Sequence, residues 1–313
     1  MIEPLRIELI RGLHNLRPRH RGCALTVGKF DGIHLGHQVL LERTRDQARR
    51  AGLPAAVLSF DPSPRDFFHK DRAPPRISSL RDKLAALQRH GIDRLVLVRF
   101  DQRIACIPPK NFLEEVLLAK LGARELIVGD DLRFGRNRAG DIQYLRSRAD
   151  ELGYGVIAVD TVEVGGERCS SSAVREALAN TDFPRVERLL GRPYRVTGRI
   201  RKGLQLGRQL DMPTANIAVR KRLALPFGVY AVVAREGERT WKGVASLGIR
   251  PTLNLSQCLL ETHLFDARVD LYGKVLEVEF RHFLRPELKF DSVDILKKQM
   301  HEDAVAARRL LDS

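Results

Sequence analysis

The sequence predicts an α/β domain built on a parallel sheet, followed by a small antiparallel β-barrel that ends in a helix. From Cys23 to about Leu190, short apolar runs alternate with amphipathic helical stretches, which is typical of a parallel sheet covered on both faces. Beyond that point, β-prone runs separated by Gly and Pro follow one another without helices, as in small barrels. The 313 residues suffice for two domains, and we expect a boundary near residues 184–192, giving domains 1–186 and 187–313.

The elements of the first domain alternate along the chain. Each strand is expected where a short continuous apolar run occurs, and each is followed by a helical pattern closed by a turn residue such as Gly52. The expected strands are 24–27, 54–60, 95–100, 125–128 and 155–159; the expected helices are 37–50, 80–90, 111–121 and 141–152, with a further helix opening near Ser170.

The second domain is predicted to be mostly strands, with a hairpin turn at Glu236-Gly237-Glu238. The expected strands are 194–200, 228–235, 240–247, 259–265 and 275–283. A final helix is expected at 292–311, because apolar residues recur there at helical spacing. Its predicted packing side is Val293, Leu296, Met300, Val305 and Leu310.

Composition narrows the class of protein. The net charge of +15 would suit a nucleic-acid binder, but Lys and Arg are spread along the whole chain and aromatic residues make up only 6%, which argues against that partner. A basic chain also suits anionic small substrates. We expect no membrane span, because no apolar run approaches about 18 residues. The four scattered cysteines, without a Cys-x-x-Cys pair, argue against disulfides and zinc and favour the cytoplasm.

A first candidate site contains His34 and His37, in Gly28-Lys29-Phe30-Asp31-Gly32-Ile33-His34-Leu35-Gly36-His37. They fall where the first strand turns into the first helix, where backbone N–H groups and the helix dipole attract anions. Two histidines three residues apart can both donate hydrogen bonds to one phosphate. The alternative is a turn histidine and a capping histidine without a ligand.

Two further segments of this domain carry candidate ligand residues. Ser170, Ser171 and Ser172 open a helix, and Arg175 lies one turn beyond, so hydroxyls and guanidinium can converge on a triphosphate; helix capping is the alternative role for the serines. The segment 129–135 follows a predicted strand, where parallel sheets place ligands. There Asp131 is a candidate to orient a ligand or a metal-bound water, and Phe134 to contact a flat ring, with a core Phe as the equal alternative.

A second candidate site lies in the predicted barrel domain. Gly203, Gly207 and Arg208 form a glycine-containing segment whose backbone N–H groups can wrap a phosphate, with an ordinary flexible loop as the alternative. Thr214 and Asn216 follow, with oxygen ligands of the kind that Mg²⁺ accepts, although Thr and Asn after Pro are also common turn residues. Glu261, on a predicted strand, is the candidate general base. Two nucleotide sites in two domains indicate an enzyme that carries out two steps.

The ordered motifs resemble, along nearly the whole chain, the bacterial bifunctional riboflavin kinase/FAD synthetases. The matching segments are 30–37, 129–135, 170–175, 190–194, 213–216, 243–252, 261–266, 270–273 and 283–290. The resemblance implies a Rossmann-like nucleotidyltransferase domain that adenylylates FMN to FAD with release of pyrophosphate. It also implies a barrel that phosphorylates riboflavin to FMN with ATP and Mg²⁺.

The resemblance also implies roles for individual residues. Glu261 would deprotonate the ribityl 5′-hydroxyl, Thr214 and Asn216 would hold Mg-ATP, and Arg285 would belong to a loop that closes over the flavin. The phosphate loop would contain Gly203, Gly207 and Arg208. In the first domain ATP would be held by His34, His37, Ser170, Ser171, Ser172 and Arg175, with Asp131 nearby.

Some positions depart from the family pattern. Asp211-Met212 stands where Gly-Phe is common, and a carboxylate near ATP oxygens is electrostatically unfavourable, which puts kinase strength in doubt. Ser63 replaces a frequent His and Lys29 a frequent Asn. Two other readings stay open from the sequence: an adenylyltransferase whose barrel only binds substrate, and a basic nucleic-acid-binding protein without turnover. The oligomeric state cannot be read from the sequence.

Overall fold

The computed structural model describes residues 6–69, 73–202, 212–219, 223–252, 255–267 and 269–313. The chain divides into two units: an N-terminal unit of Pro4–Pro74 and Lys83–Ser170, and a C-terminal unit of Pro75–Asp82 and Ser171–Ser313. The division after Ser170 places two helices with the barrel. The functional boundary at 186/187 stays a prediction.

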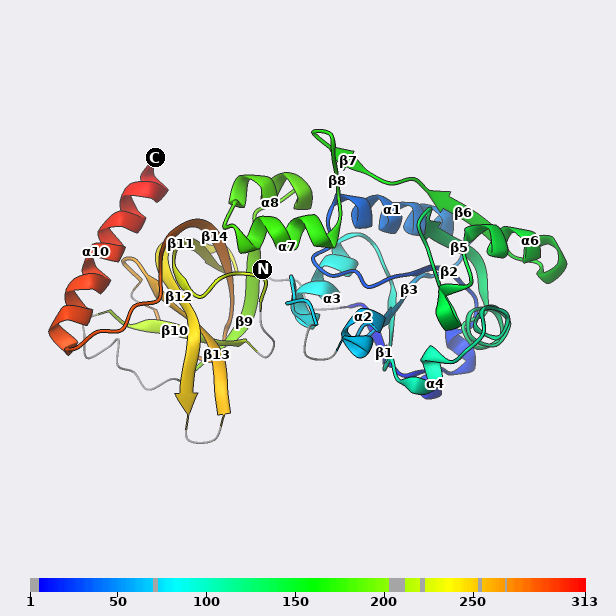
Figure 1. The fold of residues 1–313 in the computed structure, drawn as a ribbon, viewed down its shortest axis with the longest axis horizontal. Helices are drawn as coiled ribbons and strands as arrows, with labels where there is room; N and C mark the ends of the chain where they lie inside the picture. The colour runs from blue at the N-terminus through cyan, green and yellow to red at the C-terminus, as the bar shows by residue number, and fades with distance from the viewer. Residues whose placement is uncertain (1–5, 70–72, 203–211, 220–222, 253–254, 268) are drawn as a thin grey trace. The chain divides into compact units, whose positions relative to one another are not determined.

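A six-stranded parallel sheet organises the N-terminal unit (Figure 1). Its strand order is β1-β4-β3-β2-β5-β6. The strands are β1 (Glu8–Arg11), β2 (Cys23–Val27), β3 (Ala55–Phe60), β4 (Arg94–Val98), β5 (Ala123–Gly129) and β6 (Gly155–Val159). All five strands predicted in this unit are present within a few residues, and β1 is additional.

Both faces of this sheet are buried, as continuous apolar strands require. Leu25, Leu58 and Leu126 point to one face and pack with Phe112 and Leu113. The alternate residues of the same strands, such as Ala24, Val57 and Ile127, are equally inaccessible. The predicted α/β class is therefore confirmed.

Helices connect these strands. They are α1 (Leu35–Arg50), α2 (Pro64–Phe68), α3 (Leu80–Arg89), α4 (Gln102–Ala105), α5 (Pro109–Asn111), the π-helical η4 (Phe112–Lys120) and α6 (Ile142–Leu152). Asp141 caps α6 by accepting a hydrogen bond from the Tyr144 N–H. A short hairpin, β7 (Glu163–Val164) with β8 (Glu167–Arg168), precedes Ser170.

A closed six-stranded barrel forms the C-terminal unit, in the order β10-β13-β12-β11-β14-β9. Its strands are β9 (Arg195–Arg201), β10 (Thr214–Val219), β11 (Gly228–Glu236), β12 (Arg239–Thr252), β13 (Leu255–Leu264) and β14 (Val275–Pro286). The predicted hairpin between β11 and β12 is confirmed, with Gly237 at positive φ. Helices α7 (Ser171–Ala179) and α8 (Phe183–Leu190) precede the barrel, and α10 (Val293–Asp312) follows it.

The packing side predicted for the final helix is partly wrong. Val293, Val305 and Leu310 are exposed, at 63%, 69% and 37%. Met300 does pack against the barrel as predicted, together with Ala307, which is fully buried, and with Ala304 and Leu311. Small alanines let the helix approach the strands closely. The prediction selected large apolar residues and therefore did not include these alanines.

Candidate active sites

The segment between β2 and α1 is tightly folded. Phe30, Gly32 and Ile33 all have positive φ angles, of 49°, 85° and 46°. This backbone is unfavourable for Phe and Ile, and such conformations persist only where surrounding packing imposes them. Phe30 and Ile33 are fully buried, and so is Asp31. The turn therefore presents the start of α1 in one fixed arrangement.

His34 and His37 are brought together at that helix start. Their rings are stacked, with centroids 3.8 Å apart, and Phe30 packs against His37 at 4.9 Å. His34 is the N-cap residue of α1, but its side chain does not cap the helix. The arrangement does not match the alternative in which the His34 side chain caps the helix, and the anion-site role stays a prediction.

The carbonyl oxygen of Lys29 fixes the beginning of the same segment. It accepts hydrogen bonds from the ammonium group of Lys83 at 2.6 Å and from Ser59 Oγ at 3.2 Å. Lys83 is 5% exposed, so its charge lies almost entirely within the protein. Lys29 itself pairs with Asp66. Ser63, at the family's His position, caps α2 through a reciprocal pair with Asp66.

Ser170 lies on the approach to this helix start. The preceding residue, Cys169, places its carbonyl oxygen beside Gly36, where a Cβ would lie only 3.4 Å away. Any larger residue at position 36 would also crowd the His34 ring, at 3.3 Å. The N-terminal unit thus joins the His34 segment to the segment that ends in Ser170.

Ser171, Ser172 and Arg175 belong to the C-terminal unit and lie on α7. Arg175 Nε donates to the Pro75 carbonyl at 2.8 Å, and its Nη1 donates to the Ser171 carbonyl at 3.0 Å. Ser172 is exposed. These contacts fix the guanidinium against the first turn of α7.

Asp131 and Phe134 have different surroundings. Asp131 is exposed and pairs with Arg168 of β8. Phe134 is 8% exposed and packs against Phe112 and Tyr144, with ring centroids 5.8 and 6.1 Å away. The placement of Phe134 fits the alternative of a core residue.

In the barrel, strand pairing places Asn216 and Glu261 side by side on one face of the sheet. Asn216 of β10 is the direct antiparallel partner of Glu261 of β13, and Glu261 is in turn the partner of Ser246 of β12. Directly paired residues point to the same side of a sheet. This is the outer side, because Val244, two residues before Ser246, packs there with Ala307 of α10.

Thr214 lies on the same side, two residues before Asn216. The Asn216 amide nitrogen donates to the Thr214 carbonyl at 3.3 Å, which leaves its amide oxygen to accept elsewhere. The Thr214 hydroxyl and the Asn216 amide oxygen are hard, neutral donors, and Glu261 lies next to them. This donor set fits Mg²⁺, which prefers a few protein oxygens plus substrate phosphates.

Arg285 lies at the end of β14 rather than in a loop. It forms a two-pronged ion pair with Asp303 of α10, at 2.9 Å from Nε and 2.7 Å from Nη2. Gln299 also donates to Asp303. The guanidinium is thus held against the final helix.

Gly203, Gly207, Arg208 and Asp211 lie outside the described residues. Met212, beside Asp211, is buried with Val229, Ala231 and Phe265 under α10, so the unusual methionine serves the barrel's packing.

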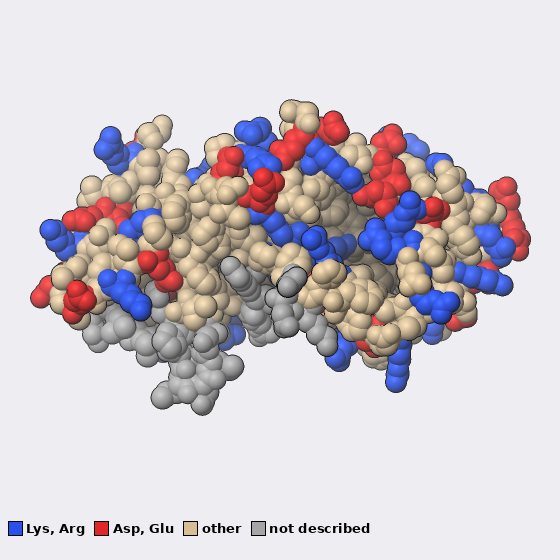
Figure 2. Space-filling view, in the orientation of Figure 1, with Lys and Arg blue, Asp and Glu red and all other residues tan. Residues whose placement is uncertain are grey.

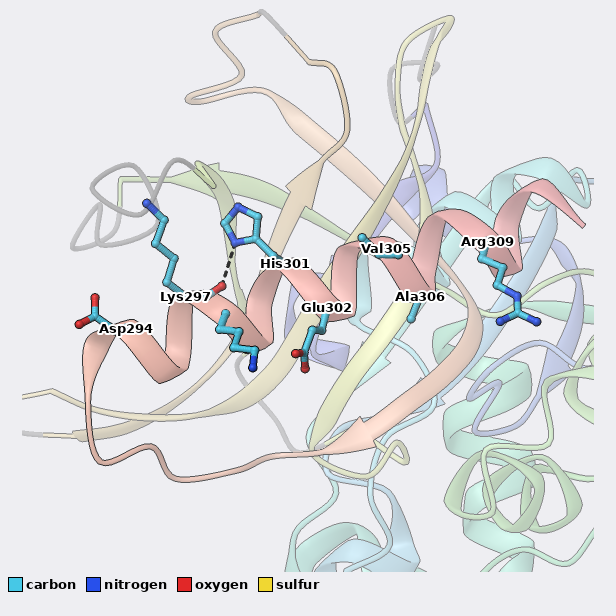
Figure 3. A pocket seen from close by; sticks show the side chains of 8 residues that line it. Asp294, Lys297, His301, Glu302, Val305, Ala306 and Arg309 are labelled. Atoms are coloured by element: carbon cyan, nitrogen blue, oxygen red, sulfur yellow. Dashed lines mark hydrogen bonds between the residues drawn. The ribbon is translucent and has the colours of Figure 1, made fainter.

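The surface carries mixed charges and a pocket on the final helix. Figure 2 shows Lys and Arg interspersed with Asp and Glu on the visible face rather than gathered in one area. Figure 3 shows a pocket on α10, with Lys297, His301, Glu302, Val305 and Arg309 among its lining residues, none of them a predicted site residue. In the described part of the chain, no helix has the length and apolar character that crossing a bilayer demands.

Three residues that lie beside the candidate sites were not predicted from the sequence as site residues: Ser246, Lys83 and His263. Ser246 and His263 become visible only when strand partners are known, although the two-residue spacing of Glu261 and His263 already places them on one face. Lys83 carries no motif, and only its burial distinguishes it.

Comparisons with known proteins match both units. A family model described as FAD synthetase matches residues 16–173, and one described as riboflavin kinase matches 190–311. The bifunctional riboflavin kinase/FMN adenylyltransferase of Pseudomonas fluorescens is 44% identical over 97% of this chain and 98% of its own. The Escherichia coli K12 protein of the same description is 42% identical, over 96% and 97%. A crystal structure described as a macrolide-efflux protein from Streptococcus pneumoniae matches with a TM-score of 0.77 and 29% identity, over 96% of this chain and 99% of that one.

Proposed function

Because the chain belongs to the family of bifunctional riboflavin kinase/FMN adenylyltransferases, we propose how its residues divide the two reactions. The enzyme phosphorylates riboflavin to FMN with ATP and then joins FMN to the AMP part of a second ATP, giving FAD and pyrophosphate. The predicted domains, 1–186 and 187–313, correspond to the second and the first reaction.

The kinase step is assigned to the outer face of β10 and β13. Glu261 accepts the proton of the ribityl 5′-hydroxyl, whose oxygen attacks the γ-phosphorus of ATP while ADP leaves. Thr214 and Asn216 would hold Mg²⁺, which would supply neutralisation of charge on the ATP phosphates. Gly203, Gly207 and Arg208 bind the phosphates, and Arg285 orients the flavin.

The adenylylation step is assigned to the start of α1. A phosphate oxygen of FMN attacks the α-phosphorus of ATP, and pyrophosphate leaves. His34 and His37 donate hydrogen bonds to the charge that grows on the phosphate oxygens. Ser170, Ser171, Ser172 and Arg175 bind ATP, and Asp131 orients the ligand. No covalent enzyme intermediate is required, because the FMN phosphate is already a nucleophile.

The observation that carries the kinase assignment is the direct pairing of Asn216 with Glu261, which places oxygen ligands beside a candidate base. Incubation with riboflavin, ATP and Mg²⁺, followed by chromatography of the flavins, tests the whole proposal. FMN and FAD are expected. FAD formed only from added FMN would restrict the barrel to substrate binding, and neither product would contradict the proposal.

We further propose that the enzyme works in the cytoplasm. The four cysteines are free thiols, which suits a reducing cytoplasm. The basic charge serves anionic small substrates rather than nucleic acid.

A further inference from the structure

His263 lies beside the kinase site without being part of its proposed chemistry. It follows Glu261 by two residues on β13, faces the same side, and is the direct strand partner of Thr214. Its Nδ1 lies 2.9 Å from the carbonyl oxygen of Pro213. A carbonyl oxygen can only accept, so Nδ1 carries the hydrogen and donates it.

This hydrogen bond acts on the peptide that precedes Thr214. The Pro213 carbonyl is held by His263, and the next carbonyl, that of Thr214, is held by the Asn216 amide. Pro213 adds a fixed φ angle. The His263 and Asn216 side chains therefore hold the two backbone carbonyls on either side of the Thr214 Cα. This fixes the direction of the Thr214 hydroxyl.

The surroundings keep His263 in one orientation. Its ring packs edge-on against Phe265, 5.9 Å away, and Arg308 of α10 covers the same Phe265 ring at 4.2 Å. Arg308 also forms a two-pronged ion pair with Asp266. Burial, aided by the nearby positive charge of Arg308, lowers the pKa of His263, which favours the neutral ring.

We propose that His263 is a positioning residue for the kinase site: it orients Thr214 for Mg-ATP through the Pro213 carbonyl and touches no substrate. This inference rests on the proposed kinase function. The proposed role of His263 differs from that of Glu261, which acts on the hydroxyl of riboflavin.

Three replacements of His263, which keep, shift or remove the donor nitrogen, test this role in the full-length protein. In His263→Asn the amide nitrogen occupies nearly the place of Nδ1, so the donor is kept, whereas in His263→Gln it is shifted toward the place of Nε2. His263→Ala removes the donor. We expect the alanine variant to raise the KM for Mg-ATP in FMN formation about tenfold, equivalent to losing one hydrogen bond of about 1.4 kcal/mol. The asparagine variant should stay within about threefold of the wild type, and glutamine should resemble alanine.

The readouts separate this inference from the proposed function. FAD formation from added FMN should be unchanged in all three variants, and His282→Ala, an exposed histidine of β14, should leave both reactions unchanged. Unchanged KM for Mg-ATP in His263→Ala would overturn the positioning role, as would rescue by glutamine equal to that by asparagine. If alanine unfolds the protein, the asparagine and glutamine variants still decide. A wild type that forms no FMN would overturn the proposed function and this inference together.

Discussion

Asn216 of β10 and Glu261 of β13 are direct partners in the antiparallel ladder of the barrel. Cβ atoms of such partners lie about 4.5–5.5 Å apart, so the proposed metal ligand and the proposed base share one patch of the sheet. The register of two strands, rather than a flexible loop, sets the geometry between the proposed base and the proposed metal ligand.

Replacing Glu261 with Gln keeps the size of the side chain and removes the base. FMN formation from riboflavin should fall by about 10² to 10⁴, the usual contribution of a general base. FAD formation from supplied FMN should continue at the wild-type rate, which serves as the internal control. Retained kinase activity would remove Glu261 from this role.

Replacing either stacked histidine should impair FAD synthesis and leave FMN formation intact, the reverse of Glu261→Gln. His34→Ala or His37→Ala should lower FAD synthesis by about 10² to 10³, as when one donor to transition-state charge is removed, while FMN formation hardly changes. Thermal melts serve as the control, because a purely structural role would lower stability and leave activity intact below the melting temperature. Normal FAD synthesis in both variants would exclude the catalytic role.

Two fragments test the functional boundary. A fragment of residues 187–313 should convert riboflavin to FMN, but it lacks Phe183, whose ring lies 6.2 Å from Tyr230 and 6.5 Å from Phe280. A fragment of residues 171–313 keeps this packing and should melt at a higher temperature. Neither should form FAD. If both melt cooperatively and neither makes FMN, the boundary at 186/187 is wrong.

The cysteines should differ sharply in reactivity. Cys106 is exposed, whereas Cys23 and Cys169 are buried, and burial raises the pKa of Cys23 to about 12 and also raises that of Cys169. Iodoacetamide at pH 8, followed by peptide mass spectrometry, should label Cys106 first and Cys23 only after denaturation. In Cys106→Ser this early labelling should disappear. Equal labelling of Cys23 in the native protein would contradict its burial.

Glu8 should contribute a pH-dependent part of the stability. It accepts hydrogen bonds from Arg19 at 2.8 Å and His20 at 3.0 Å, and the Arg19 bond is the main reason why its pKa lies below the ordinary 4.5. The folded state therefore favours the carboxylate, and this stabilisation is present above pH 4.5 and lost as the pH falls through the lowered pKa.

A Glu8→Gln variant measures this contribution. Its melting temperature should lie below that of the wild type at pH 7, and the difference should shrink as the pH falls below 4.5. Glu238→Gln, in the exposed turn between β11 and β12, should match the wild type throughout. A difference that grows on acidification would contradict the assignment.

Long-range pairing explains what the sequence alone could not predict. Strands β2, β3, β4, β5 and β6 can be predicted from their apolar runs, since continuous burial needs continuous apolar sequence. Strand β10 is different, because Thr and Asn after Pro213 are common turn residues, and it is pairing with β13 and β9 that makes Thr214 to Asn216 part of a strand. Residue types and motifs indicated His34, His37 and Glu261 as candidates. The partner of Arg285, Asp303, lies 18 residues later and depends on how α10 docks.

Closure of the barrel has a consequence for how the protein fails under stress. In the closed barrel each strand pairs with a neighbour on both sides over part of its length, which leaves fewer backbone N–H and C=O groups open to a strand from another molecule than an open sheet does. The parallel sheet does end in open edge strands, β1 and β6. Intermolecular β-aggregation on heating should therefore begin in the N-terminal unit, even if the barrel is the first to lose its activity.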